Sequence, residues 1–459
     1  MPLRLALIAL LLAQQVPPAP LPLTLEQALQ YALEHYPSVQ AAVEQVQASA
    51  AGVSVAKAGY LPRLDSAWQS NRATANNIFG QVLPQSVIPS MSGPVLPSAS
   101  ADSVWSSAVG ALFSWEPFDL GLRDATVAGA EVAVMRARAG EALTRLEVQS
   151  AVGAAFLGVV AAERAVIAAK ADLDRRETLA RIVHTLVDNQ LRPGAEASRI
   201  DAERAAASTR LIQAQATLTL AQSTLARLLG VKTGTVAVDA ANLLEQRPLP
   251  AAADATAAGH PLVQMHQAAV DAAKAQEAIL ARTDRPRLYL QSSLFARGSG
   301  ANPNGQLDGS ISGLGLDRTN WAAGVQVVFP NLFDFSSLRA RKTGAAASER
   351  AEAALYDEAM LTITSQQQVA AAMVLATRAV AANMPVQLAA AQQSESQARA
   401  RYQAGLAGIV EVAETQSLLA QAEYQDQIAR VDVWRALLAE AVSRGTLAPF
   451  VALLHPEAR

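Results

Sequence analysis

Two glutamates behind a glycine-containing turn are the residues whose type and spacing point most directly to an electrostatic function. Glu411 and Glu414 are three residues apart, so on a helix they lie on one face. Carboxylates that line a passage attract cations and repel anions. Alternatively, the two side chains stabilise the start of a solvated helix, where the helix dipole favours acidic residues. The spacing alone leaves both interpretations open.

Patterns for catalysis, metal binding or nucleic-acid binding are missing from the sequence. The chain has no cysteine, which excludes disulfides, thiolate catalysis, cysteine-ligated zinc and lipidation on cysteine. The histidines are His35, His184, His260, His266 and His455, and no two of them are four residues apart. No Ser/His/Asp cluster or catalytic carboxylate pair stands out. The formal charge of −3 gives no basis for nucleic-acid binding. We expect no enzyme activity, no cofactor and no metal.

Very long helices must position any functional side chain in this sequence. The run from Leu120 to Asp188 contains no proline and is rich in Ala, Glu, Arg, Val and Leu, which favour helix. At about 1.5 Å per residue it would be roughly 100 Å long, too long for a compact core to bury. Small and apolar residues recur in it every seven residues, at Leu146, Gly153, Val160 and Ile167. This spacing predicts coiled-coil packing against partner helices.

The N-terminus has the pattern of a secretory signal peptide, which we place at residues 1–19. Arg4 precedes a short apolar run, Leu5–Ala13, and a proline-rich stretch follows. No later segment offers eighteen uncharged apolar residues, so we expect no membrane-spanning helix. A membrane would therefore have to be crossed by a closed β-barrel.

Four segments have the two-residue periodicity of strands, at about 63–72, 104–115, 287–296 and 321–329. In the second, Trp105, Val109, Ala111, Phe113 and Trp115 share one side. Four short strands cannot close a barrel, which needs about eight or more. The strand count thus predicts that several copies of the chain combine.

The second half of the sequence repeats the first. Pro37 recurs as Pro261, 224 residues later, and Phe118-Asp119 recurs as Phe333-Asp334, 215 residues later. Each half is predicted as helix, two strands, long helix, turn and return helix. Repeat 1 is predicted at 20–230, with its long helix at 120–188, turn at 189–195 and return helix at 196–229. A connector follows at 231–258. Repeat 2 is predicted at 259–445, with its long helix at 336–402, turn at 403–408 and return helix at 409–444, and a tail follows at 446–459.

The two half-repeats, the export signal and two motifs together resemble the TolC-like outer-membrane efflux proteins. The motifs are Trp321 followed by Phe329-Pro-Asn-Leu-Phe-Asp334, and the turn Arg401-Tyr-Gln-Ala-Gly405-Leu-Ala-Gly-Ile-Val-Glu411-Val. The resemblance covers essentially the whole mature chain. It implies a mainly α-helical homotrimer with one twelve-stranded β-barrel in the outer membrane and an α-barrel tunnel of coiled-coil hairpins in the periplasm. It further implies a periplasmic adaptor protein and an inner-membrane pump of the RND or ABC class as partners.

The resemblance also assigns roles at the two helix turns. Glu411 and Glu414 would form an acidic ring from three chains, and Tyr402 and Glu196 would hold the closed tip. Ala407 stands where relatives of the best-known type carry a basic residue, so Arg192 or Arg401 would have to replace that contact. Gln190 replaces the usual glycine of the first turn, which suggests a different turn shape.

The remaining assignments concern exposed tips and interfacial aromatics. We expect adaptor contacts from Leu191, Arg192, Pro193, Gly405, Leu406 and Ala407, although each could be a plain turn residue. Trp105, Trp115 and Trp321 are expected in the aromatic girdles of the barrel, or else packed where strands meet helices. The predicted function is a passive outer-membrane exit duct of a tripartite efflux or type I secretion system. The alternative is a periplasmic coiled-coil adaptor or scaffold without a pore, which the four strands disfavour. An outer-membrane enzyme lacks candidate residues.

Overall fold

The protein is described from a computed structural model that covers residues 22–231, 236–240, 243–244, 256–330 and 334–454. The predicted signal peptide, most of the predicted connector and the last five residues lie outside this part of the chain. The described chain divides into two compact units. One consists of Met1–Val46, Arg136–Ala268 and Ala353–Arg459, and the other of Gln47–Met135 and Ala269–Glu352.

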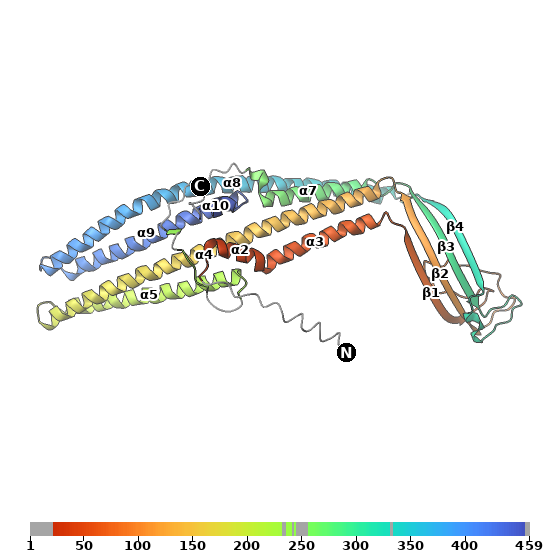
Figure 1. The fold of residues 1–459 in the computed structure, drawn as a ribbon, viewed down its shortest axis with the longest axis horizontal. Coiled ribbons are helices and arrows are strands. Elements are labelled where there is room, and N and C mark those ends of the chain that lie inside the picture. The colour runs from red at the N-terminus through yellow and green to blue at the C-terminus, as the bar shows by residue number, and fades with distance from the viewer. Residues whose placement is uncertain (1–21, 232–235, 241–242, 245–255, 331–333, 455–459) are drawn as a thin grey trace. The chain divides into compact units, whose positions relative to one another are not determined.

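The elements follow the predicted repeat, with the boundaries shifted by at most three residues (Figure 1). The first half contains α2 (Leu25–His35), α3 (Pro37–Ala58), β1 (Arg63–Thr74), β2 (Ser103–Phe118), α4 (Leu122–Asp188) and α5 (Gly194–Leu228). The second contains η1 (Ala257–Gly259), α7 (Pro261–Leu280), β3 (Arg287–Ser299), η2 (Ile311–Leu314), β4 (Arg318–Val328), α8 (Phe335–Gln403), α9 (Ile409–Ser443) and α10 (Ala448–Ala452).

Local sequence explains where several helices begin. Thr24 caps α2 in a reciprocal box with Gln27. Asp119 caps α4 by accepting hydrogen bonds from the backbone N–H groups of Gly121 and Arg123. Arg123 also pairs with Asp119 through its side chain at 2.9 Å. These contacts lower the pKa of Asp119 although burial opposes them.

Two antiparallel hairpins, α4 with α5 and α8 with α9, make up most of the helical unit (Figure 1). Their largest apolar cluster lies where α2, α10 and residues 236–240 and 243–244 meet the hairpins. Trp434 is 1% exposed at its centre, stacks edge-on against Phe450, and donates from Nε1 to the Leu243 carbonyl at 2.6 Å. A small separate cluster at the helix tips includes Val183, Ile200 and Tyr402.

Two of the described helices, α4 and α8, each contain an 18-residue window apolar enough to cross a membrane by length and composition. This differs from the expectation that no later segment would qualify, because alanine and valine score as apolar even when an occasional arginine interrupts them. In α4 the apolar stretch supplies Val152, Phe156 and Val160 to the main cluster. Core packing therefore accounts for the composition of α4.

The four strands form one antiparallel sheet in the order β1-β2-β3-β4. Cross-strand pairing places Trp68, Val109 and Ala296 in one row, and Leu294 and Trp321 beside Ala111 in the next row on the same face. This face is apolar and largely exposed. The opposite face is polar, and residues 75–102 fold over it, with Ile88 packed on Ala108 and Phe295.

Glycines at the end of β3 and in η2 lie where neighbouring backbones approach closely. Gly298 belongs to β3. A Cβ atom there would lie 1.6 Å from the Gly315 carbonyl oxygen, and one at Gly313 would lie 1.8 Å from the Trp105 carbonyl oxygen. Glycine is required at both positions because two backbones approach each other closely.

We predict that Trp434→Ala destabilises the protein far more than Trp321→Ala. Trp434 is buried and hydrogen-bonded, so its truncation leaves a cavity that costs about 3–5 kcal/mol of unfolding free energy. Trp321 is 78% exposed, so its truncation in detergent should change that value by less than about 0.5 kcal/mol. Both changes in unfolding free energy can be measured from thermal unfolding curves recorded by circular dichroism. Equal shifts for the two variants would contradict the position of the core.

A second prediction concerns acid stability. His260 is buried, its Nε2 contacts the Val442 carbonyl at 3.1 Å, and its Nδ1 accepts from Leu262 N. Burial holds the pKa of His260 below its ordinary value of 6.5. The unfolded state therefore binds more protons, and stability should fall as pH drops below about 6.5. His260→Gln should reduce this pH dependence, measured as melting temperature against pH.

Candidate functional site

The two helix–helix turns share one backbone geometry. After α4, Leu191 N donates to Leu186 O and Gln190 N to Val187 O. After α8, Leu406 N donates to Arg401 O and Gly405 N to Tyr402 O. This is the Schellman pattern, and the residue that closes each helix has positive φ, +59° for Gln190 and +72° for Gly405. The expectation of a different first turn was therefore wrong, because Gln190 adopts the left-handed conformation that glycine adopts in the second turn.

Tyr402 joins the two hairpins at their tips. It is 3% exposed, and its hydroxyl donates to Glu196 Oε2 at 3.1 Å. Arg192 lies over the Tyr402 ring at 4.8 Å and is 3.9 Å from Glu196 Oε1. Burial and the neighbouring Glu196 carboxylate raise the pKa of Tyr402 above 10.0. The phenol therefore keeps its proton at neutral pH and remains a donor.

The two predicted ring carboxylates have different surroundings. Glu411 is partly exposed and accepts from Arg401 at 2.9 Å, within the same hairpin. Glu414 is exposed. Arg401 therefore partly neutralises Glu411, whereas the ion pairs found in the described chain do not involve Glu414. The two positions cannot contribute equally to a local negative potential.

The predicted adaptor-contact residues also separate into two groups. Leu191 and Leu406 are 67% and 73% exposed, and Pro193 and Gly405 are exposed as well. Ala407 is half-buried. Arg192 is turned back onto Tyr402 and Glu196, so only part of its side chain reaches the surface.

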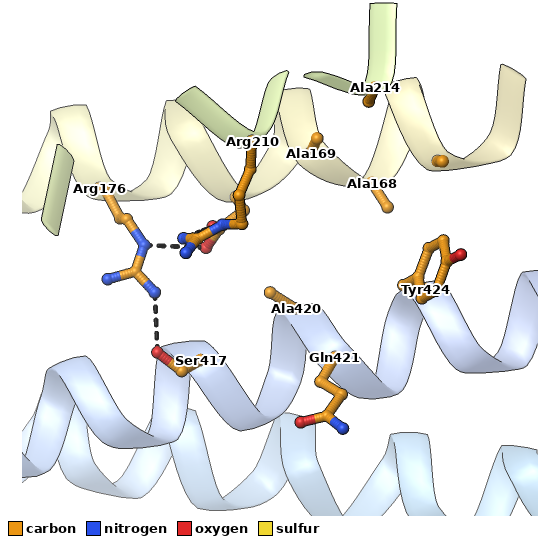
Figure 2. Close-up of a pocket in the computed structure, with 11 residues that line it drawn as sticks. Ala168, Ala169, Arg176, Arg210, Ala214, Ser417, Ala420, Gln421 and Tyr424 are labelled. Carbon is orange, nitrogen blue, oxygen red and sulfur yellow. Dashed lines mark hydrogen bonds and ion pairs between the residues drawn. The ribbon is translucent and has the colours of Figure 1, made fainter. Parts of the chain in front are cut away.

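A polar cluster farther along the hairpins connects three helices, and the sequence did not predict it. Arg176 is 2% exposed and pairs with Asp172 on α4, with Glu203 on α5 at 2.6 Å, and with Ser417 on α9 at 2.9 Å. Arg210 of α5 also binds Asp172, at 2.8 Å. The cluster borders a pocket of about 400 Å³ that five alanines also line, with Gln421 and Tyr424 on α9 (Figure 2).

A second link between the hairpins lies beside this cluster. Arg175 of α4 binds both carboxylate oxygens of Glu423 on α9, at 2.8 and 3.1 Å. The four-residue spacing of Asp172 and Arg176 is visible in the sequence as a helix pair. Their partners on α5 and α9 are not visible, because they are set by how the hairpins pack.

The aromatic residues predicted at the membrane interface lie on the apolar face of the sheet. Trp105 and Trp115 are ten residues apart on β2, about 34 Å along a strand, or about 26 Å in height at the usual tilt. That height matches the apolar band of an outer-membrane barrel. Trp115 also donates from Nε1 to the Tyr60 carbonyl at 3.0 Å, so it packs where the sheet meets the helices. Trp321 lies between these levels, in register with Ala111 through Leu294.

Solved structures share this fold. The chain superposes on CusC, whose crystal structures concern folding and transmembrane channel formation, with a TM-score of 0.76 and 14% identity over 92% of both chains. It superposes on the outer membrane protein VceC of Vibrio cholerae with a TM-score of 0.71 and 18% identity, over 92% of this chain and 96% of VceC.

Sequence comparison agrees with the structural likeness. Protein CyaE of Bordetella pertussis is 26% identical over 404 residues, which cover 86% of this chain and 78% of CyaE. Residues 28–231 and 252–439 match the outer membrane efflux protein family, with one matched segment in each half of the chain. The chain therefore belongs to the outer membrane efflux protein family.

Proposed function

We propose that three copies of this chain form a passive exit duct through the outer membrane. The observation that supports this most is the four-stranded sheet, which ends in unpaired edges at β1 and β4. Backbone groups at an open edge cannot be satisfied in lipid, and four strands are too few to close a barrel. Three copies supply twelve strands. The exposed apolar face of the sheet supports lipid contact and argues against a pore-free periplasmic adaptor.

In this proposal the helical hairpins form the periplasmic wall of the duct. A helix of 67 residues, such as α4, is roughly 100 Å long and reaches far beyond the membrane. The exposed Leu191 and Leu406 at the turns suit an apolar contact with a periplasmic adaptor protein, which would couple the duct to an inner-membrane pump of the RND or ABC class. Export would use the N-terminal segment 1–19.

The tip contacts support a closed resting state that is held within each chain. The Tyr402–Glu196 hydrogen bond and the position of Arg192 on the Tyr402 ring tie the α4–α5 hairpin to the α8–α9 hairpin. The Arg175–Glu423 and Arg176–Ser417 contacts repeat this link farther from the turns. If one hairpin moved to open the tip, these contacts would break one after another, beginning at the turns.

We predict that Tyr402→Phe increases the conductance of the purified protein in planar bilayers. The change removes the hydroxyl that donates to Glu196 but keeps the ring that Arg192 covers. A hydrogen bond to a charged group contributes about 1.5–3 kcal/mol, so the open population should rise about tenfold or more. Single-channel recording measures the open population directly.

The matched control for this experiment is Tyr424→Phe on α9. Tyr424 is 43% exposed and lies away from the turns, so the conductance of the Tyr424→Phe variant should equal that of the unaltered protein. Glu196→Gln should act in the same direction as Tyr402→Phe. If neither tip variant changes the open population, the contact does not hold the closed state.

The same proposal places Glu411 and Glu414 of three chains around the duct axis near the tip. Six carboxylates would then favour cations. Because Arg401 pairs with Glu411, Glu414 would contribute most of the unbalanced charge. Arg401 thus sets how strongly the ring attracts cations.

We predict graded changes in cation selectivity from these residues. Glu414→Gln should shift the reversal potential in a salt gradient more than Glu411→Gln does, and the double variant should also lose block by multivalent cations. Arg401→Gln should raise cation selectivity, because it frees the Glu411 carboxylate. Unchanged selectivity in the double variant would remove the ring assignment.

A further inference from the structure

The polar face of the sheet carries a row of hydrogen-bond donors beneath residues 75–102. Cross-strand pairing aligns Gln69 on β1, Ala108 on β2, Arg297 on β3 and Arg318 on β4. Ala108 is fully buried between Gln69 and Arg297, and Ile88 of the covering segment packs on it. The two arginines are direct neighbours, an arrangement that is unfavourable without a compensating negative charge.

Arg297 is buried, and two of its nitrogens are unpaired within the described part of the chain. It is 3% exposed, and its Nε and Nη1 atoms have no hydrogen-bond acceptor there. The buried Nε2 of Gln69 is also unpaired, while its Oε1 accepts from Leu83 N at 3.0 Å, which fixes the orientation of the amide. Arg318 lies over the Phe79 ring at 5.7 Å. Ion pairs in the described chain include neither arginine.

The covering segment is held in place by its own contacts. Gln85 accepts from Val87 N and Ile88 N and donates to Ile88 O, all within 2.7 Å. Asn71 on β1 donates to Gln81 O at 3.0 Å. The donors are therefore enclosed between the sheet and residues 75–102, where an unpaired charge is costly.

We infer that Gln69, Arg297 and Arg318 form a binding site for an oxyanion group, a phosphate, sulfate or carboxylate. All the unpaired atoms of the row are donors, and guanidinium groups match the geometry of these anions. A bound oxyanion would compensate both arginines and connect residues 75–102 to the sheet through its neighbours. The position of this site inside the duct rests on the proposed function, whereas the site itself is formed within one chain.

Anion binding can be measured on the purified full-length protein in detergent. The melting temperature is followed while sodium sulfate or inorganic phosphate replaces sodium chloride at constant ionic strength. We expect both oxyanions to raise the melting temperature of the unaltered protein. Arg297→Gln should raise the melting temperature measured without oxyanion, because it removes an unpaired buried charge. It should also weaken sulfate binding, so that the half-saturating sulfate concentration rises at least tenfold.

Two further variants make this test specific. Arg318→Gln should also weaken the sulfate response, and it should leave folding intact because Arg318 is only half-buried. Arg72→Gln is the matched control, since Arg72 is on the opposite face of the sheet and binds Ser103. No sulfate response in the unaltered protein, or an equal response in all three variants, would overturn the site.

Current recordings separate this inference from the duct itself. If the protein conducts, sulfate should reduce the current of the unaltered protein but not of Arg297→Gln. A protein that does not conduct but still shows the Arg297-dependent sulfate response would refute the duct and retain the anion site. A protein that conducts but lacks the Arg297-dependent sulfate response would retain the duct and refute the anion site.

Discussion

The unpaired edges of the sheet are the constraint on which the rest of the structure depends. Every backbone N–H and C=O along the outer side of β1 and β4 needs a partner, and each group left unpaired in hydrocarbon costs several kcal/mol. An apolar face that includes Trp68, Val109 and Trp321 makes lipid the suitable surroundings for this sheet. In the proposed duct the chain is therefore incomplete as a monomer, and its edge strands would pair with those of further copies.

Periodicity was sufficient to predict the elements, but not how they end or pack. The strand predicted at 321–329 is observed at Arg318–Val328, because pairing with β3 decides where β4 begins. The turn at Gln190 was misjudged because residue type is a weaker determinant than the geometry of a long hairpin. Arg192 was expected both as an exposed tip residue and as a replacement for the basic residue missing at Ala407, and it lies over the ring of Tyr402 on the other hairpin.

Long-range polar contacts were beyond sequence reasoning for a physical reason. Arg176 binds Glu203 on the next helix and Ser417 on the other hairpin, 27 and 241 residues away. Nothing in the local spacing specifies those partners. A buried arginine needs good geometry with all its partners, and loss of one partner is strongly destabilising. Such contacts therefore fix the relative register of the hairpins, which an alanine-rich seam alone would define weakly.

The distribution of apolar and polar contacts explains why movement would be confined to the tips. Around Trp434 and Phe156 the hairpins share a large dry cluster, and separating them there would expose many buried side chains. Near the turns the apolar cluster is small, and polar contacts such as Tyr402–Glu196 provide much of the remaining attachment. Water can replace a polar contact at modest cost, whereas it cannot replace apolar packing. The same sequence thus combines a fixed base with separable ends.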